Sequence, residues 1–127
     1  MNTLPPYAEF LGIRIEAGDG DPPLLVMPFG DHLVGRPGFL HGGTIAGLLE
    51  IAAFTALYQA LDDEKPKVKP INVTVDFMRG GRYLDTRAEG RVTRIGTRIA
   101  NVTAKAWQSD SSKPIATATM ILLLDRS

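Results

Sequence analysis

The sequence predicts a single α+β domain in which a curved antiparallel sheet of five to six strands surrounds one long helix. Three observations support this prediction. Residues 41–61, HGGTIAGLLEIAAFTALYQAL, are apolar or small almost throughout and are long enough for a central helix. Two short strand patterns precede this stretch, and after Pro70 apolar and polar residues alternate for most of the remaining chain. A helix that is apolar nearly all round must be covered on more than one side, which a curved sheet achieves.

Composition excludes several functional classes. The 127 residues include 14 basic and 14 acidic side chains, giving a formal net charge of +0, which argues against nucleic acid or a membrane surface as a partner. The chain has no cysteine, so it has no disulfide framework, thiolate metal site or cysteine nucleophile. Two histidines are too few for a histidine-rich metal site, and we expect no metal. The N-terminus shows no basic region followed by an apolar run, which favours a cytoplasmic protein.

The beginning of the chain predicts a short helix followed by a strand. Residues 3–10 form an amphipathic entry of one or two helical turns, which begins after a pair of prolines. Residues 11–16, LGIRIE, alternate as a half-buried strand with Leu11, Ile13 and Ile15 on one face.

A hairpin and a loop complete the part before the long helix. Residues 17–23, AGDGDPP, have the composition of a turn, and residues 24–29, LLVMPF, read as the second strand of a hairpin. Residues 30–40, GDHLVGRPGFL, predict an irregular loop.

The long helix begins at glycine and ends before an acidic loop. Gly42 and Gly43 mark its start, and residues 62–64 with Pro66 mark its end. The stretch has the length of a membrane span, but Glu50, Gln59, threonines and glycines interrupt its apolar character. We therefore expect a core helix rather than a membrane helix.

The remaining chain predicts four strands separated by polar turns. Their patterns cover residues 71–77, 84–95, 99–107 and 115–124. The first break falls at residues 79–82, RGGR, the second near Gly96, and the third at residues 108–114, QSDSSKP.

Glu50 and Gly42 are the two features of the helix that point to chemistry. Glu50 is the single charged residue of the apolar run, and an unpaired buried carboxylate is costly. The glycine start leaves unobstructed backbone N–H groups, which favour negative charge and would polarise a carbonyl oxygen. Eight residues of helix separate Gly42 from Glu50 by roughly 12 Å, too far for both to contact one reacting group. The spacing therefore predicts a homodimer in which the helix start of one chain faces Glu50 of the other.

The residues of this stretch resemble a known family. The pattern H-G-G-x-x-x-x-L-x-E, at His41, Gly42, Gly43, Leu48 and Glu50, is similar to that of hotdog-fold acyl-CoA thioesterases, closest to the PaaI-like and 4-hydroxybenzoyl-CoA thioesterase group. The similarity extends to three further segments, VTVDFMRGG (73–81), GRVTRIGTRIANVTAKAW (90–107) and ATATMILLL (116–124).

The resemblance implies a fold, a reaction and a set of site residues. It implies an antiparallel sheet wrapped around a central helix, in homodimers that often pair into tetramers. It implies hydrolysis of an acyl-CoA to free acid and CoA, so that CoA is part of the substrate and no cofactor is needed. The Gly42 N–H would hold the thioester carbonyl, and Glu50 of the opposite subunit would act as nucleophile or general base. His41 and Gly43 belong to the same constellation, with His41 ordering the helix start.

The chain departs from the family at two auxiliary positions. Many relatives carry Asn or Gln six residues before the histidine, where this sequence has Gly35. A second polar helper of some relatives lies one turn after the carboxylate, where this sequence has Phe54 with Thr55 beside it. At both positions this chain therefore lacks the side chain that makes the auxiliary contact in those relatives.

Further candidates surround this centre. Arg79, Arg82 and Arg98 predict a cationic rim for the phosphates of CoA, with Gly80 and Gly81 leaving room for the pantetheine arm. The aromatic residues Phe39, Phe54, Tyr58 and Phe77 are candidates for lining an acyl pocket. Solvated turns and plain core packing explain the same residues equally well.

Two alternatives to a thioesterase stay open. One is a hydratase or dehydratase of acyl thioesters, in which His41 and Glu50 would act together on the acyl chain. The other is an acyl-CoA binding protein without catalysis, which the missing side chain at Gly35 makes credible.

Overall fold

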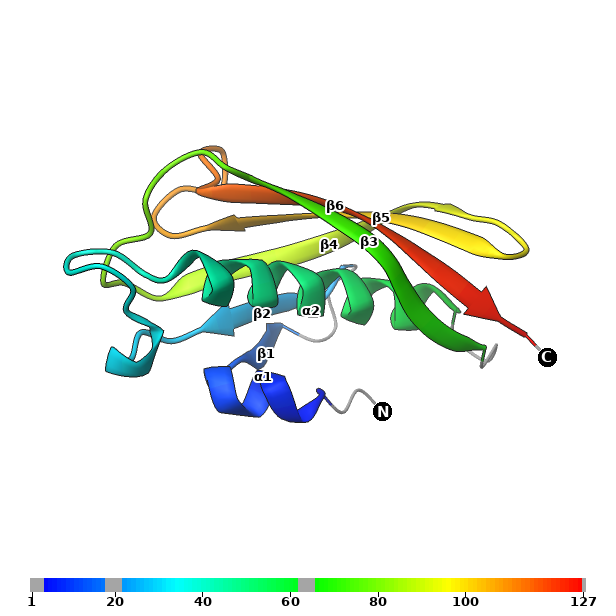
Figure 1. Cartoon of the computed structure of the whole chain (residues 1–127), viewed down its shortest axis with the longest axis horizontal. Helices are drawn as coiled ribbons and strands as arrows, with labels where there is room; N and C mark the ends of the chain where they lie inside the picture. Colours follow the sequence, from blue (N-terminus) through cyan, green and yellow to red (C-terminus); the bar gives the residue numbers. More distant parts are fainter. Residues whose placement is uncertain (1–3, 18–21, 62–65, 127) are drawn as a thin grey trace.

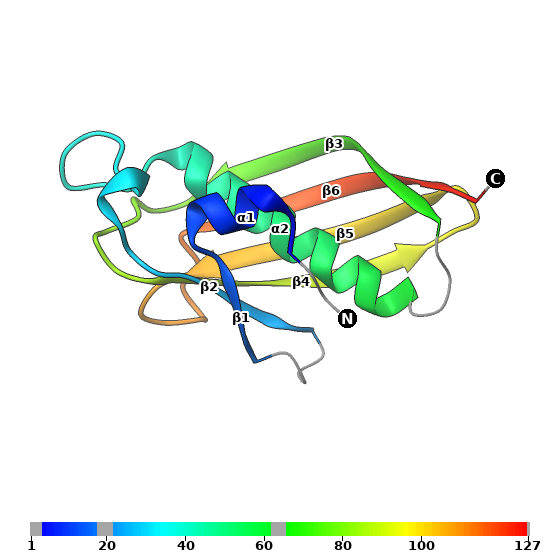
Figure 2. The same cartoon turned by 90° about the horizontal axis from the view of Figure 1, so that it is seen from below.

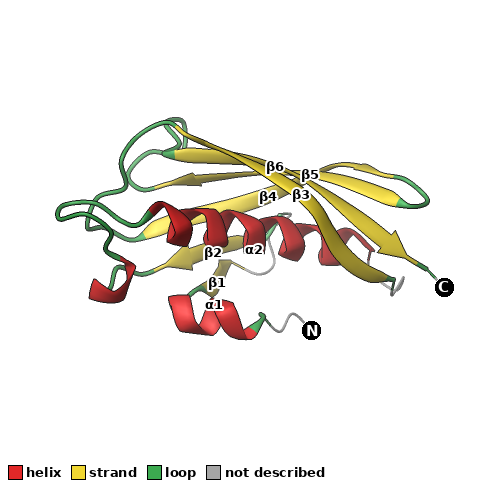
Figure 3. Cartoon of the chain, in the orientation of Figure 1, coloured by secondary structure: helices red, strands yellow, loops and turns green. Residues whose placement is uncertain are grey.

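Six antiparallel strands form one sheet, and a long helix lies across one of its faces (Figures 1 and 3). The computed structural model describes residues 4–17, 22–61 and 66–126. The elements in chain order are α1 (Pro6–Leu11), β1 (Arg14–Ala17), β2 (Leu24–Met27), a 3₁₀ turn (Asp31–Leu33), α2 (Gly42–Leu61), β3 (Lys67–Phe77), β4 (Thr86–Ile95), β5 (Ile99–Trp107) and β6 (Ala116–Asp125).

The strand order in space is β1-β2-β4-β5-β6-β3. Strand β3 is therefore not beside β2 or β4, its neighbours in sequence, but forms the edge of the sheet next to β6. The α+β class and the sheet of five to six strands around one helix are therefore confirmed, with six strands. This is the hotdog arrangement that the sequence resemblance implied.

Helix α2 forms the centre of the core because its long sheet-facing side is apolar. Leu48, Leu49 and Leu57 are completely buried, and they pack against apolar residues of β4, β5 and β6. At Gly90 of β4 the approach is close, because an added Cβ atom would lie 2.5 Å from the Ala52 carbonyl oxygen. The helix and the strand therefore meet backbone to backbone.

Helix α1 covers part of the opposite side of α2, as Figure 2 shows. The contact uses Gly47, whose Cβ position lies 2.9 Å from the Tyr7 ring and 3.2 Å from the Leu11 side chain. By length and composition α2 is also apolar enough to cross a membrane, a test that buried core helices pass as well. Most of its side chains lie inside the domain.

The boundaries differ from the sequence prediction at the N-terminal strand. Leu11 ends α1, and Gly12 follows with φ 78°, the left-handed conformation that closes a helix. The predicted strand 11–16 was therefore wrong for its first residues, since β1 begins at Arg14. The segment LGIRIE therefore spans the last residue of α1 and the first residues of β1. It alternates because Leu11 of the helix and Ile13 before the strand both point into the core.

The hairpin prediction is confirmed, because β1 pairs antiparallel with β2. Strand β2 ends at Met27, two residues before the predicted end. Part of the predicted turn 17–23 and the acidic residues 62–64 lie outside the described residues.

The later strands follow the predicted order. The prediction for 99–107 matches β5 residue for residue, and β6 is shifted by one residue. Strand β4 begins at Thr86 rather than residue 84, and β3 begins four residues earlier than predicted. The early start passes through Pro70, which a sheet edge tolerates because the missing N–H is not needed there.

Edge strand β3 exposes apolar side chains on the side of the sheet that carries α2. Val73 pairs with Met120 and Phe77 pairs with Ala116, and both partners face the core. Directly paired residues of an antiparallel sheet point to the same face. Phe77 is nevertheless 55% exposed and Val73 36% exposed, so the core side of β3 is left uncovered.

Candidate active site

A pocket of about 600 Å³ lies where the start of α2 meets the end of β3 and the loop that follows it. It contains eight of the residues proposed from the sequence, together with Arg36, Leu40, Ile45 and Met78. The eight are Gly35, Phe39, His41, Gly42, Phe77, Arg79, Gly80 and Gly81. Its charged lining residues are arginines, and no carboxylate lines it among the described residues.

The hydrogen bonds of the helix start leave Gly42 as the open donor. The His41 Nδ1 atom accepts a hydrogen bond of 2.8 Å from the Gly43 N–H, and the His41 carbonyl accepts from the backbone N–H and side-chain hydroxyl of Thr44. No described residue accepts a hydrogen bond from the Gly42 N–H, which is among the donors that a helix start leaves without an intrahelical partner. The ring of Phe77 stands beside it, 3.4 Å from the position of a Gly42 Cβ.

His41 therefore acts as the cap of α2. Because Nδ1 accepts from an amide, the neutral imidazole carries its proton on Nε2. Its backbone N–H also donates to the Leu33 carbonyl at 2.7 Å, which fixes the loop before the helix. These contacts tie the loop before the helix to the first turn of α2.

The structure explains why glycine stands at position 35. A Cβ atom there would lie 2.9 Å from the His41 Cα atom, closer than side chains approach backbone. The Gly35 N–H donates to the Phe39 carbonyl, which closes the loop tightly against the helix start. An Asn or Gln side chain would require this loop to move, so the departure from the family is built into the loop conformation.

The wall opposite the helix is a loop held by many contacts. Gly80 lies against the ring of Phe39, with its Cβ position 2.5 Å from Cε1, and the Gly81 carbonyl accepts from the Leu40 N–H. Further along, the side-chain amide of Gln108 bonds both the N–H and the carbonyl of Arg82. The two glycines thus serve close packing of the wall as well as access to the pocket.

The predicted cationic rim is partly assembled at this pocket. Arg79 lines it and donates to the Pro114 carbonyl, whereas Arg82 lies with its guanidinium carbon 4.8 Å from the centre of the Phe39 ring. Sequence reasoning missed Arg36, which contacts the same ring at 4.3 Å. Arg98 lies in the turn between β4 and β5, at the end of the sheet away from the start of α2 (Figure 1).

Glu50 lies on the open side of α2, outside this pocket. Its side chain is half-buried, and no described residue forms a hydrogen bond or an ion pair with it. Ala46 and Phe54 flank it one turn before and one turn after, and both are half-buried. The ring of Phe54 stacks on Tyr58, 6.2 Å between centres, which extends this open side toward the helix end.

Thr55 does not share this side of the helix. It is buried, and its hydroxyl donates to the Ile51 carbonyl at 2.7 Å. Within one chain the structure thus brings together the helix start and the loop residues, and it leaves Glu50 about two turns away and Phe54 about three turns away.

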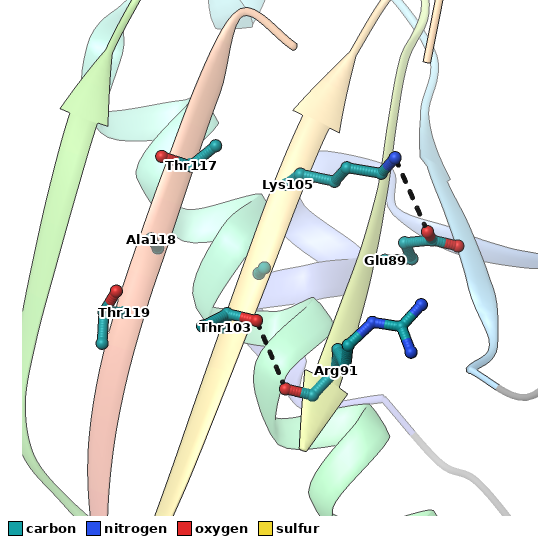
Figure 4. A pocket seen from close by; sticks show the side chains of 8 residues that line it. Glu89, Arg91, Thr103, Lys105, Thr117, Ala118 and Thr119 are labelled. Carbon is teal, nitrogen blue, oxygen red and sulfur yellow. Dashed lines mark hydrogen bonds and ion pairs between the residues drawn. The ribbon is translucent and has the colours of Figure 1, made fainter. Parts of the chain in front are cut away.

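A second hollow of about 370 Å³ lies on the outer face of the sheet (Figure 4). Threonines from two strands line it, with Arg91, Glu89 and Lys105 at its rim. It has no helix terminus, and its carboxylate at Glu89 lies 4.0 Å from Lys105. The pocket at the start of α2 is therefore the better candidate for chemistry, and among the described residues no cluster of His, Asp or Glu suits a metal ion.

The sequence and the fold of this chain are similar to those of known proteins. The family model of the thioesterase superfamily matches residues 37–115, which include the helix start, Glu50 and the loop after β3. No curated protein matches the chain at a significant level.

Solved structures with the same fold include several thioesterase-family proteins. A thioesterase family protein from Silicibacter pomeroyi is 25% identical, with a TM-score of 0.85 over 97% of this chain and 91% of that one. A mutant thioesterase from Pseudomonas aeruginosa is also 25% identical, with a TM-score of 0.84 over 95% and 86%.

A third solved structure is a phenylacetic acid degradation-related protein from Ralstonia eutropha JMP134. It is 22% identical to this chain, with a TM-score of 0.81 over 97% of this chain and 92% of that one, which shows a shared fold. Because the family model covers more than half of the sequence, the chain belongs to the thioesterase superfamily.

Proposed function

We propose that this protein is an acyl-CoA thioesterase whose site is completed by a second copy of the chain. The observation that carries the proposal is the separation of the two chemical groups in one chain. The pocket offers the Gly42 N–H and no carboxylate, and the open side of α2 offers the carboxylate of Glu50 without a partner among the described residues.

The spacing along α2 defines how a second copy would complete the site. Gly42 and Glu50 are roughly 12 Å apart along the axis, so a two-fold axis level with Ala46 exchanges their positions, about 6 Å from each. Glu50 of the partner would then lie at the level of the Gly42 N–H. The methyl side chain of Ala46 permits the close approach that such an axis requires.

The edge of the sheet supports the same pairing. Two copies of one strand related by a two-fold axis run antiparallel, and β3 is a long edge strand with free backbone groups on its outer side. Its core-facing Val73 and Phe77 are exposed in one chain and would be covered by the partner. Pairing would also remove the aggregation hazard of an open apolar edge.

The chemistry follows from these positions. The thioester carbonyl oxygen accepts a hydrogen bond from the Gly42 N–H. This bond stabilises the negative charge that develops on the oxygen when the carbonyl carbon is attacked. In the general-base route, Glu50 of the partner takes a proton from water, whose oxygen attacks that carbon. The carbon–sulfur bond breaks and the proton passes to the thiolate of CoA. In the nucleophilic route, the Glu50 carboxylate attacks that carbon directly, the carbon–sulfur bond breaks and CoA leaves as the thiolate. Water then hydrolyses the resulting anhydride, which returns the Glu50 carboxylate, releases the free acid and supplies the proton that the thiolate takes up.

The contacts of His41 favour this reaction over hydration of the acyl chain. A hydratase that used His41 as a base would need a free ring nitrogen facing the substrate. Here Nδ1 is occupied by the Gly43 N–H, and Nε2 carries the proton of the neutral ring.

The direct test measures thiol release from a panel of acyl-CoAs. We expect the wild type to release thiol and Glu50→Gln to lower kcat about 10²- to 10⁴-fold, since the substitution removes the base or nucleophile but keeps the shape. Glu89→Gln, on the outer face of the sheet, is the matched control and should keep full activity. Hydration without thiol release would instead indicate a hydratase, and binding without turnover would indicate a carrier.

Mixed dimers test whether the site is shared. Gly42→Pro removes the N–H at the first helical position, where proline fits, and should be inactive alone. Mixing it with Glu50→Gln creates heterodimers that hold one intact site, so about a quarter of the wild-type activity should return. Activity that stays at the level of the separate variants would contradict a site built from two chains.

A further inference from the structure

The turn between β4 and β5 carries the same tripeptide on both of its sides. Residues 93–95 and 97–99 each read Thr-Arg-Ile, with Gly96 between them. Figure 1 shows this hairpin tip beyond the end of α2, on the side of the molecule away from the candidate site. Arg94 and Arg98 are exposed, and neither side chain forms a hydrogen bond or an ion pair with a described residue. The proposed function gives this motif no role.

The two isoleucines of the tip lie on opposite faces of the sheet. Ile95 pairs with the completely buried Ala100, so it points to the face that carries α2. Ile99 precedes Ala100 in β5 and therefore points to the outer face, where it pairs with Leu123. The side chains of Ile95 and Ile99 are nevertheless 38% and 43% exposed. The tip therefore presents apolar surface on both of its sides.

Backbone hydrogen bonds hold this tip in place. The Gly96 N–H donates to the Ile99 carbonyl at 2.8 Å, which closes the turn. The Nε–H of Arg126, from the end of β6, donates to the Thr97 carbonyl at 2.9 Å. This second contact brings a third guanidinium group to the tip.

Further basic side chains lie beside the tip at the ends of β6 and β3. On the outer face, Ile99, Leu123 and Lys69 form one row across β5, β6 and β3. Within residues 66–69, 94–99 and 122–126, which the structure describes, the cations outnumber the single acid, Asp125; these cations are Lys67, Lys69, Arg94, Arg98 and Arg126. The formal net charge of +0, which argued against a membrane surface, therefore hides a basic end of the sheet.

We infer that the β4–β5 tip docks on an anionic lipid surface. The exposed isoleucines would enter the boundary between headgroups and acyl chains, and the surrounding arginines and lysines would face the lipid phosphates. Charge alone would suit nucleic acid or an acidic protein equally well. Lipid is favoured because apolar side chains on opposite sides of one tip are both covered by a medium that surrounds the tip, whereas the surface of a macromolecule covers one side.

Docking at the tip is compatible with the proposed dimer and does not depend on hydrolysis. The pairing proposed for β3 leaves the tip open, because β6 lies between β3 and β5 in the sheet. A protein that releases no thiol can therefore still bind lipid, and an active thioesterase can fail to do so.

Co-sedimentation of the full chain with vesicles tests the docking. We expect binding to vesicles of phosphatidylcholine mixed with phosphatidylglycerol, little binding to phosphatidylcholine alone, and weaker binding as the salt concentration rises. Arg94→Gln combined with Arg98→Gln should lower the affinity about 20- to 30-fold, since each basic residue at an anionic lipid surface contributes a factor of about five. Arg14→Gln combined with Lys113→Gln removes the same charge from exposed positions elsewhere, and should bind as the wild type.

The isoleucines distinguish lipid from other anionic partners. Ile95→Thr combined with Ile99→Thr keeps β-branched side chains, which suit a strand, and removes much of the apolar surface. We expect its affinity for the mixed vesicles to fall at least about tenfold. Thermal melting of every variant shows whether a loss of binding reflects the tip or a loss of folding.

Three results would contradict docking on lipid. One is absence of binding between the wild type and the mixed vesicles, and another is an equal loss of affinity in the Arg14→Gln, Lys113→Gln control. The third is undiminished binding by the variant with both threonines, which would indicate a purely ionic surface for nucleic acid or an acidic protein.

Discussion

The two sides of α2 differ in how closely they are packed. On the sheet side, the helix backbone at Ala52 approaches β4 so closely that Gly90 has no room for a Cβ atom. On the open side, Glu50 is half-buried and has no hydrogen bond or ion pair among the described residues. The comparison teaches that one side of the helix sets the stability of the fold, while the other is the side to which the proposed function assigns a partner and a substrate.

Among the substitutions that test this difference in packing, we expect Gly90→Ala to have the largest effect. The added methyl group would meet the Ala52 carbonyl oxygen at 2.5 Å, and backbone on both sides cannot yield without moving the helix. We expect the free energy of unfolding to fall by about 3 kcal/mol, measured by denaturant unfolding. On the open side, Glu50→Gln should change that free energy by less than about 0.5 kcal/mol. Similar losses for the two variants would show that the sides are not different in packing.

A smaller effect is expected from Val73→Lys on the exposed edge strand. In one chain this side chain is 36% exposed, so the fold should tolerate lysine, whereas a paired β3 edge would bury the charge. We expect the dissociation constant of the dimer to rise at least about tenfold, with activity per chain falling in parallel as the protein is diluted. Sedimentation analysis measures the first quantity.

Thr97→Lys is the control for that experiment, because Thr97 is exposed in the turn between β4 and β5, away from the edge. Dimers of Val73→Lys as tight as those of Thr97→Lys would show that β3 is not the contact.

The smallest effect is expected from Glu16→Gln, which lies far from α2. The Arg87 side chain donates hydrogen bonds to the Glu16 carboxylate and lowers its pKa, and the pair joins β1 to β4 across β2. Because the folded-state pKa lies below its ordinary value, the carboxylate stabilises the fold at neutral pH, and this stabilisation is lost as the pH falls through the lowered pKa. Thermal melting should therefore separate the variant slightly from the wild type at pH 7 and not at pH 2. A constant difference across this range would exclude the ion pair as its cause.

The sequence predicts most of the fold because its periodicities are long. The apolar run of α2 and the alternation of β5 extend over enough residues for one period to dominate, and both elements lie within a residue of their predicted bounds. The start of β1 was wrong because Leu11 fits either a helix end or a strand, and the left-handed conformation of Gly12 decides between them. A glycine after an apolar residue is itself a helix-stop signal, and here the alternation of LGIRIE masked it.

In the candidate site, too, the residues of a local motif were predicted, and those whose role depends on contacts between distant segments were not. Motif residues such as His41 and Gly42 were found because they are adjacent in sequence, and they line one pocket. Arg36 was missed because its significance depends on Phe39 and on Arg82, which folding brings beside it from a distant loop. The reason for Gly35 likewise became visible only with its distance to the His41 backbone.

The anchored loop after β3 has a consequence for how this protein can diverge. Gln108, Tyr83 and the packed Gly80 fix the pocket wall within a single chain, so the entropy of ordering that half of the site is spent during folding. The side of α2 that carries Phe54 and Tyr58 bears few such constraints. Under the proposed function, substitutions there would alter which acyl groups fit without disturbing the half assigned to the carbonyl, so a lineage could change substrate while keeping its chemistry.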